Sequence, residues 1–299
     1  MHGVEAPIAP RNEKVIPTGR SQAQRTLDFI YVGTPKAGST WLFEALGDHP
    51  EVRLFPSKSS KFFETPSPKP IAHYQRQIDG FPDGGRIGEI SHDVYLYPGS
   101  AAFLRKHFPG VRIVVCLREP GDFARSLILW LRSHTREYGD HPRDMMAHPK
   151  LRAWMDYHAG LAQFFREFPR EQILVTFFDD FRSDPRAFYR AVCRHIGIDP
   201  VYLPASLGKV VNPARAPRFP LLTRSAYHIG GVLRAVGFGP FVEAVKRSSV
   251  VERILYDGSQ DVDPAVVECA TRQREQARSS LDALESLIGQ PVPESWRAI

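Results

Sequence analysis

The sequence predicts a single α/β domain in which a central parallel sheet is flanked by helices. Short apolar runs alternate with stretches of helical periodicity, a pattern typical of a parallel sheet covered on both faces. The first apolar run leads through a glycine-containing loop directly into a helical segment. Neither an internal repeat nor a linker divides residues 26–299, whereas residues 1–25 lack a periodic apolar pattern and are expected to form a flexible N-terminal arm.

The first predicted unit is a strand, a loop and a helix. The apolar run Phe29–Val32 stops at Gly33, as a short buried strand does. After loop residues 34–38, a helix is expected over Ser39–Leu46, ending near Gly47. A second strand is predicted at Ile87–Ser91.

The strongest strand signal is Val111–Leu117, which is bounded by a Pro-Gly pair on each side. A helix should follow from Asp122 to Arg132, because apolar residues recur there at helical spacing. Beyond it we expect a helix over Lys150–Phe168 and a strand over Ile173–Phe177.

Two further helices complete the prediction. The segment Asp184–Ile196 is expected to be helical and to stop at Gly197. The segment Asp263–Ile288 reads as a long helix with an apolar stripe, and Gly289 is a candidate C-cap.

Composition limits the classes of function. The chain has 299 residues, a formal charge of +6 and a pI near 9.3, which suits an anionic ligand. Nucleic acid is not expected as a partner, because no basic block or helix-turn-helix pattern accompanies the charge. The three cysteines, Cys116, Cys193 and Cys269, show neither disulfide nor zinc spacing. With no signal peptide or apolar run long enough to span a membrane, we expect a cytoplasmic location.

The loop after the first strand has the form of a modified phosphate-binding loop. In the pattern GxxxxGK followed by Ser or Thr, Gly33, Gly38 and Thr40 are in register, but Ser39 takes the lysine position and Lys36 lies inside the loop. Amides and a helix N-terminus would still face an anion, and a lysine inside the loop can lie against the bridging oxygen of a phosphosulfate. No metal-holding carboxylate follows the next apolar strand, so a divalent metal ion is not implied.

The segment from Thr34 to Leu42, TPKAGSTWL, resembles the 5′-phosphosulfate-binding loop of the sulfotransferase family. The resemblance implies that the donor is PAPS, 3′-phosphoadenosine-5′-phosphosulfate, and that 3′,5′-ADP is released. It also implies that the phosphosulfate is held by Lys36, Ala37, Gly38, Ser39 and Thr40, and that Trp41 packs on the adenine.

A second segment, from Ile113 to Ser126, resembles the 3′-phosphate site of the same family. Arg118 ends a strand, and Ser126 follows eight positions later in the next helix. The guanidinium of Arg118 would bind the phosphate dianion, and Ser126 would add a hydroxyl donor. Weaker resemblances at residues 177–185, 211–215 and 284–296 extend the likeness over about residues 28–296, so that residues 26–299 are expected to form a sulfotransferase domain.

This chain departs from the family pattern at the position of the catalytic base. The heparan-type branch carries glutamate where this chain has Ser59 in the segment Lys58–Phe63. The small-molecule branch carries histidine in a K-T-H segment, which places His92 at the histidine position. We therefore predict His92 as the base, since its intrinsic pKa suits that task, with Glu89 and Asp93 in reserve. Lys58 is a further candidate for supporting the donor sulfate.

The predicted reaction is sulfuryl transfer from PAPS to a hydroxyl, or in second place an amine, of a sugar, lipid or small-metabolite acceptor. Lys36 would stabilise the leaving phosphate. Four aromatic residues are candidates for the acceptor pocket, and three histidines are expected in loops near its mouth. These are Tyr95, Tyr97, Trp130 and Trp154, and His134, His141 and His148.

Three alternatives remain open from the sequence. The strand–loop–helix is shared with P-loop nucleotide kinases, so a phosphotransferase is possible in principle, although the kinase lysine is missing. A non-catalytic nucleotide-binding module would account for Ser59 and for Ile90 in the lysine position of K-T-H. A basic nucleic-acid binder is the third alternative.

Overall fold

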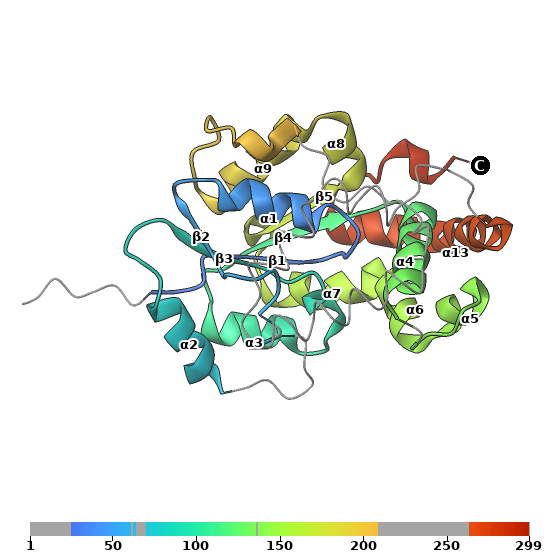
Figure 1. The fold of residues 1–299 in the computed structure, drawn as a ribbon, viewed down its shortest axis with the longest axis horizontal. Coiled ribbons are helices and arrows are strands. Elements are labelled where there is room, and N and C mark those ends of the chain that lie inside the picture. The colour runs from blue at the N-terminus through green and yellow to red at the C-terminus, as the bar shows by residue number, and fades with distance from the viewer. Residues whose placement is uncertain (1–24, 61, 64–69, 136, 209–262, 299) are drawn as a thin grey trace, which may run out of the picture.

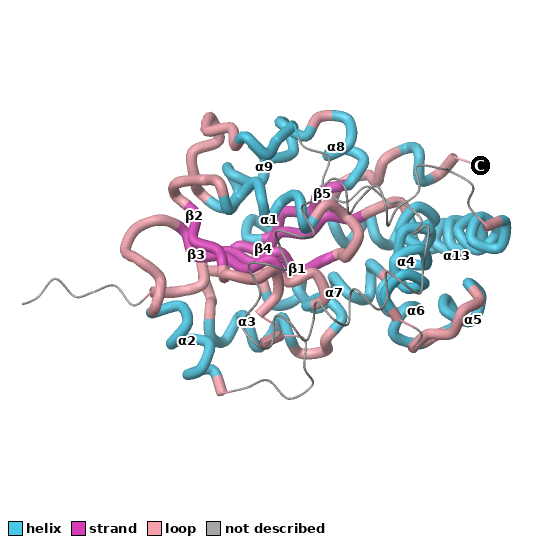
Figure 2. The backbone as a smooth tube through the Cα atoms, in the orientation of Figure 1, coloured by secondary structure: helices cyan, strands magenta, loops and turns pink. Residues whose placement is uncertain are grey.

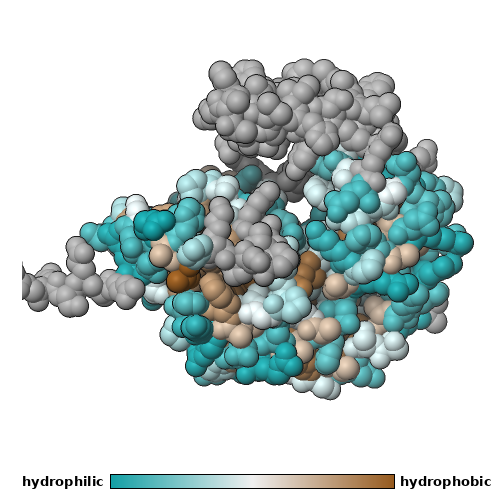
Figure 3. All heavy atoms as spheres, turned by 90° about the horizontal axis from the view of Figure 1, so that it is seen from below, coloured by the Kyte–Doolittle hydropathy of each residue, from teal (hydrophilic) through white to brown (hydrophobic). Residues whose placement is uncertain are grey.

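The structure is a computed structural model that describes residues 25–60, 62–63, 70–135, 137–208 and 263–298. The predicted arm, apart from Arg25, and the family-like segment at residues 211–215 lie outside this part of the chain. Helices surround a central group of strands (Figure 1, Figure 2). Seen from the side of α2 (Ile71–Asp79) and α3 (Ser100–His107), the described surface is mainly hydrophilic, with apolar atoms in small separate areas (Figure 3).

The sheet has five strands in the order β2-β3-β1-β4-β5, and every pairing is parallel. The strands are β1 (Phe29–Gly33), β2 (Val52–Leu54), β3 (Arg86–Ile90), β4 (Arg112–Leu117) and β5 (Ile173–Phe177). In register, Tyr31 of β1 lies beside Ile90 on one side and Val114 on the other. The predicted α/β class with a central parallel sheet is confirmed.

The central strand β1 is buried on both faces, and its side chains alternate between two cores. Ile30 and Val32 join a core with α2, α3, α7 (Tyr157–Glu167) and α13 (Pro264–Ile288), and Phe29 and Tyr31 join a core with α1 (Ser39–Gly47) and α9 (Pro185–Ile196). Figure 1 shows α1, α8 (Phe178–Ser183) and α9 on one side of the sheet and α2, α3 and α7 on the other.

A third, smaller core lies beyond the end of the sheet. It joins α4 (Pro120–His134), α5 (Pro142–Ala147) and α6 (Pro149–Met155) to the first turns of α13. Its members include Leu127, Met145, Met146 and Trp154. Figure 1 shows these helices grouped together on the side of the molecule where α13 lies.

The predicted helix over Lys150–Phe168 is wrong in its continuity, because the chain forms α6 and α7 with a break at Asp156. Asp156 leaves the helical region (φ −86°, ψ 79°), and its carboxylate accepts a hydrogen bond of 2.9 Å from the amide of Ala159. A side chain that caps the second helix therefore ends the first. The sequence reading also missed β2, α2, α3, α5 and α8, and α4 begins at Pro120, two residues before the predicted start.

Among the described residues, no helix is both long and apolar enough to cross a bilayer. Within the same ranges, His, Cys, Asp and Glu side chains form no group of three or more suited to a metal ion.

Candidate active site

The order of the strands creates a switch point between β1 and β4. The chain places β2 and β3 on one side of β1 and then crosses to β4 and β5 on the other. In open parallel sheets, ligands bind beyond the carboxyl ends of the strands at such a point. Lys36, in the loop after β1, and Arg118, directly after β4, lie at this position.

A hydrogen bond joins the two segments directly. Nη1 of Arg118 donates to the main-chain carbonyl of Lys36 at 2.8 Å. Two residues earlier in each segment, the chain is anchored as well, since both the amide and the hydroxyl of Thr34 donate to the carbonyl of Cys116, at 2.9 and 3.0 Å. The two sequence-predicted cations therefore face a common site.

The start of α1 is left open to an anion. Gly38 at the N-cap adopts a left-handed conformation (φ 83°), no side chain caps the helix, and its first turn carries no acidic residue. Lys36 is left-handed as well (φ 61°), which turns the loop sharply. Ala37 and Ser39 are almost completely buried. At the start of a helix, the main-chain amides without an intrahelical partner are the groups that meet a phosphate.

Two lysines meet at this loop. Nζ of Lys58 donates to Oγ1 of Thr40 at 2.8 Å and lies 3.4 Å from Oγ of Ser39. Burial, together with the charges of Lys58 and Arg118, lowers the pKa of Lys36 to about 8. Burial likewise lowers the pKa of Lys58 to about 8, although Asp93 and Glu44 oppose the shift. Such crowded cations are stabilised by a bound anion.

Contacts with three neighbouring residues hold Arg118 in place. Its guanidinium lies over the ring of Phe178, 4.6 Å from the centroid, and its carbonyl accepts from the hydroxyl of Tyr157 at 2.8 Å. Nε of Arg118 is buried and has no hydrogen-bond partner among the described residues. A buried unpaired donor on a guanidinium fits a ligand oxygen. Ser126 is buried on α4, and its predicted part in this site stays a prediction.

Trp41 has a different environment from the one that the resemblance implies. Only 3% of its surface is exposed, and its ring packs against Phe181, Phe188 and Tyr189 at centroid distances of 4.6, 6.1 and 6.4 Å. This packing favours a core role between α1 and α8–α9, and the contact with adenine stays a prediction.

His92 lies near both lysines, just after β3. Burial and the positive charges of Lys58 and Lys36 lower the pKa of His92 to about 3. Its Nε2 lies 3.3 Å from Oδ1 of Asp93, and its Nδ1 is buried without a hydrogen-bond partner among the described residues. A proton on Nε2 is favoured by the carboxylate, which leaves Nδ1 as the bare, proton-accepting nitrogen.

Glu89, named in reserve as a base, is a buried anchor in the structure. One carboxylate oxygen accepts from the amide and the hydroxyl of Ser60, at 2.9 and 2.8 Å, and from the hydroxyl of Ser91. The other accepts from the hydroxyl of Tyr74. These bonds fix the segment that carries Lys58, and they occupy both oxygens of the carboxylate.

Of the four aromatic candidates for an acceptor wall, two are core residues. Tyr95 is buried, and its hydroxyl donates to the carbonyl of Trp154, itself buried, at 2.7 Å. Trp130 is half-buried, and Nζ of Lys36 lies 5.7 Å from its ring centroid. Trp130 therefore borders the site on the α4 side, with His134 stacked on it at 4.8 Å.

Two of the three histidines expected in loops cap helices. Nδ1 of His141 accepts from the amide of Arg143 at the start of α5, and Nδ1 of His148 accepts from the amide of Lys150 at the start of α6. Pro142 and Pro149 occupy the first helical positions, where proline is favoured.

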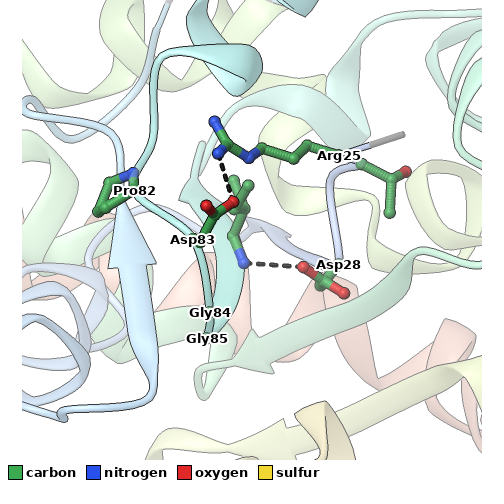
Figure 4. Close-up of a pocket in the computed structure, with 8 residues that line it drawn as sticks. Arg25, Asp28, Pro82, Asp83, Gly84 and Gly85 are labelled. Atoms are coloured by element: carbon green, nitrogen blue, oxygen red, sulfur yellow. Dashed lines mark hydrogen bonds and ion pairs between the residues drawn. The ribbon is translucent and has the colours of Figure 1, made fainter. Parts of the chain in front are cut away.

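A separate cavity of about 260 Å³ lies at the opposite, amino-terminal ends of β1 and β3 (Figure 4). Its charged groups are paired. Arg25 pairs with Asp83, and Asp28 accepts from the amide of Ile87 at 2.8 Å. This cavity contains none of the sequence-predicted site residues.

Three comparisons with known proteins show which proteins this chain resembles. Residues 96–201 match a family model described as "Sulfotransferase family", and this range includes Arg118 and Ser126 but not the Lys36 loop. A bovine (Bos taurus) relative, bifunctional heparan sulfate N-deacetylase/N-sulfotransferase 2, is 24% identical over 226 residues, which cover 65% of this chain and 24% of the relative. The chain thus spans about a quarter of the length of this curated relative.

Among solved structures, a sulfotransferase from Alicyclobacillus acidocaldarius superposes with a TM-score of 0.63 at 20% identity, covering 91% of this chain and 98% of that one. Mouse sulfotransferase SULT7A1, solved with PAP, gives a TM-score of 0.39 at 14% identity, covering 76% and 87%. Residues 96–201 are therefore similar to the sulfotransferase family, and the fold of the chain is similar to that of the Alicyclobacillus acidocaldarius sulfotransferase.

Proposed function

We propose that the protein is an enzyme that transfers a sulfuryl group from PAPS to a hydroxyl of an acceptor, releasing 3′,5′-ADP, with residues 26–299 as the catalytic domain. The observation that carries this proposal is the hydrogen bond from Arg118 to the carbonyl of Lys36, which sets two cations at the switch point of the sheet. PAPS has negative charge at both its 3′-phosphate and its 5′-phosphosulfate, so two separated cations match it.

The donor would be held by three kinds of group. The uncapped start of α1 offers main-chain amides to the 5′-phosphosulfate, and Lys36 and Lys58 offer charge. Arg118 would bind the 3′-phosphate, since its buried Nε has no hydrogen-bond partner within the ranges that the structure describes. No metal ion is part of the proposal.

In the transfer step, one bond to sulfur forms while another breaks. The acceptor oxygen forms a bond to sulfur while its proton passes to Nδ1 of His92. The bond from sulfur to the phosphate oxygen breaks, and its electron pair stays on that oxygen, where Lys36 stabilises the charge. The negative donor also offsets the charges of Lys36 and Lys58, which raises the pKa of His92 from about 3 and makes it a better base in the complex.

The acceptor class stays broad in this proposal. A hydroxyl of a sugar, lipid or small metabolite is the first choice. An amine is the second choice, and the bovine relative, named as an N-sulfotransferase, supports keeping it. The three buried, unpaired cysteines fit a reducing compartment, and we propose a cytoplasmic location.

The test compares ligands that differ only at the groups invoked. Isothermal titration calorimetry with 3′,5′-ADP, 5′-AMP and ATP should give the tightest binding for 3′,5′-ADP, because the last two lack a 3′-phosphate. Equal affinity for all three would overturn the assignment of Arg118. Magnesium-dependent tightening of ATP alone would instead favour a nucleotide kinase.

Activity is tested by incubating the protein with PAPS and a metabolite extract and analysing the products by mass spectrometry. Products heavier by one sulfuryl group, formed with chelator present, are expected. Tight 3′,5′-ADP binding without any sulfated product, and without hydrolysis of PAPS to water, would favour a non-catalytic nucleotide-binding module.

A further inference from the structure

The residue next to Arg118 connects the proposed 3′-phosphate site to a distant helix. Glu119 is 5% exposed and caps α4, accepting hydrogen bonds from the amides of Gly121 at 2.9 Å and Asp122 at 2.7 Å. The same carboxylate accepts from Nε and Nη2 of Arg274, on α13, both at 3.0 Å. Each oxygen therefore receives one bond from the start of α4 and one from α13.

Glu119 and Arg274 each stabilise the charged form of the other. Burial of Glu119 favours its neutral form, yet the hydrogen bonds from Arg274 and from the amides of Gly121 and Asp122 outweigh burial and lower its pKa. Glu119 in turn raises the pKa of Arg274. A two-pronged contact of this kind fixes direction as well as distance, because the guanidinium and the carboxylate are both planar.

Close packing of α4 against α13 brings Arg274 next to Glu119. A Cβ added at Gly121 would lie 2.8 Å from the carbonyl oxygen of Ala270 and 3.3 Å from Cβ of Arg274. Only a glycine lets α4 and α13 approach so closely, and Arg274 lies one turn beyond Ala270 along α13. The contact is thus built from the backbone of both helices.

The main chain at Arg118 is consequently held at its carbonyl and at the residue that follows. Tyr157, on α7, donates to that carbonyl at 2.8 Å, and Arg274 holds the following residue, Glu119. The direction in which the Arg118 side chain leaves the main chain depends on these restraints. At its outer end, the side chain contacts the ring of Phe178 and the carbonyl of Lys36.

We propose that Arg274 is a positioning residue for the 3′-phosphate site, acting on Arg118 through the carboxylate of Glu119. The inference rests on the proposed function, because it assigns a purpose to the orientation of Arg118. It adds a residue that lies outside the sequence motifs, 155 positions away from Glu119 in the chain.

The experiment measures the affinities of 3′,5′-ADP and 5′-AMP by isothermal titration calorimetry for the full-length protein and three variants. Arg274→Ala should weaken 3′,5′-ADP binding roughly tenfold, the loss expected when one charge-assisted hydrogen bond from Arg118 is weakened, and leave 5′-AMP within about twofold. Arg274→Lys keeps the charge but loses the two-pronged contact, so an intermediate loss is expected. Arg272→Ala is the matched control, since Arg272 pairs with the exposed Glu268 at 3.2 Å on the same helix.

The ratio of the two affinities separates positioning from a general loss of structure. If Arg274→Ala weakened both nucleotides equally, or neither, the inference would be overturned while the proposed function stood. If the unmodified protein itself failed to prefer 3′,5′-ADP over 5′-AMP, the proposed function would fall and the inference with it. Thermal unfolding of each variant, recorded alongside, verifies that the comparison is between folded proteins.

Discussion

The side chain of Arg118 donates a 2.8 Å hydrogen bond to the main-chain carbonyl of Lys36, so the loop after β1 and the end of β4 are directly joined. Each of these residues belongs to a different sequence motif, 82 positions apart. The bond leaves the ammonium of Lys36 and Nε of Arg118 for other partners. It therefore fixes the spacing of two charges without neutralising either.

Removal of the Lys36 ammonium should abolish most of the proposed activity. Lys36→Ala is expected to lower kcat by about 100-fold or more, the loss found when one group that stabilises developing charge is removed. The unfolding temperature should stay within a few degrees, because the charged amine is destabilised by burial. Lys150→Ala, at an exposed lysine on α6, is the control and should change neither quantity.

Donor affinity should decrease at alkaline pH. The pKa values of Lys36 and Lys58 are both lowered to about 8, so their charges are present below pH 8 and lost above it. Binding of 3′,5′-ADP should weaken about fivefold between pH 8 and pH 9 for each lysine that must be charged. Lys58→Gln should reduce this slope, and a flat profile in the unmodified protein would contradict the role of both lysines.

The lowered pKa values of Lys36 and Lys58 should make the unliganded protein more stable as the pH rises, although they weaken donor binding. Between about pH 8 and the ordinary lysine value of 10.5, the unfolded chain binds more protons at these two positions than the folded one. Their contribution to the free energy of unfolding therefore rises with pH across this window. Urea denaturation at pH 8 and pH 10, compared between the unmodified protein and Lys58→Gln, measures it.

The proposed base should stay active in mild acid. With a pKa of about 3, His92 is unprotonated throughout the range from pH 5 to pH 8, so kcat/KM for PAPS should not fall with an apparent pKa near 6.5. His92→Gln should lower kcat at least about 100-fold and leave 3′,5′-ADP affinity nearly unchanged. His73→Gln, on α2, is the control, and a His92→Gln variant with normal kcat would assign the base elsewhere.

The contact between α4 and α13 gives a prediction about stability. Gly121→Ala should destabilise the protein by about 1–3 kcal/mol, because its Cβ would lie 2.8 Å from the carbonyl of Ala270. Gly110→Ala is the matched control, since nothing lies within 4 Å of a Cβ at that position. Equal midpoints of urea denaturation for the two variants would show that the helices can separate without cost.

Much of the sheet could be predicted because its signals are local. Buried parallel strands are uniformly apolar, so β1, β4 and β5 stand out in the sequence. Gly197 and Gly289 adopt left-handed conformations at the ends of α9 and α13, as expected for helix-ending glycines. In contrast, β2 has only three residues, too few for a periodic pattern.

The site could be predicted only as far as its motifs reach. Lys36 and Arg118 follow β1 and β4 at the switch point of the sheet, and their predicted contacts with the donor stay predictions. The residues that hydrogen-bond to the site residues are brought there by tertiary packing. No local sequence pattern predicts that Glu119 pairs with Arg274 or that Glu89 pairs with Tyr74. The near-complete burial of Trp41 depends in the same way on α8 and α9, more than 130 residues along the chain.

The third core, which joins α4–α6 to α13, is separate from the two cores that cover the sheet. It is built partly from methionines and large aromatics, side chains that repack readily around altered neighbours. Trp130, the indole beside Lys36, is packed against this core. A substitution in this core would therefore alter two things at once, the border of the proposed site at Trp130 and, through the shared contact between α4 and α13, the surroundings of Arg118.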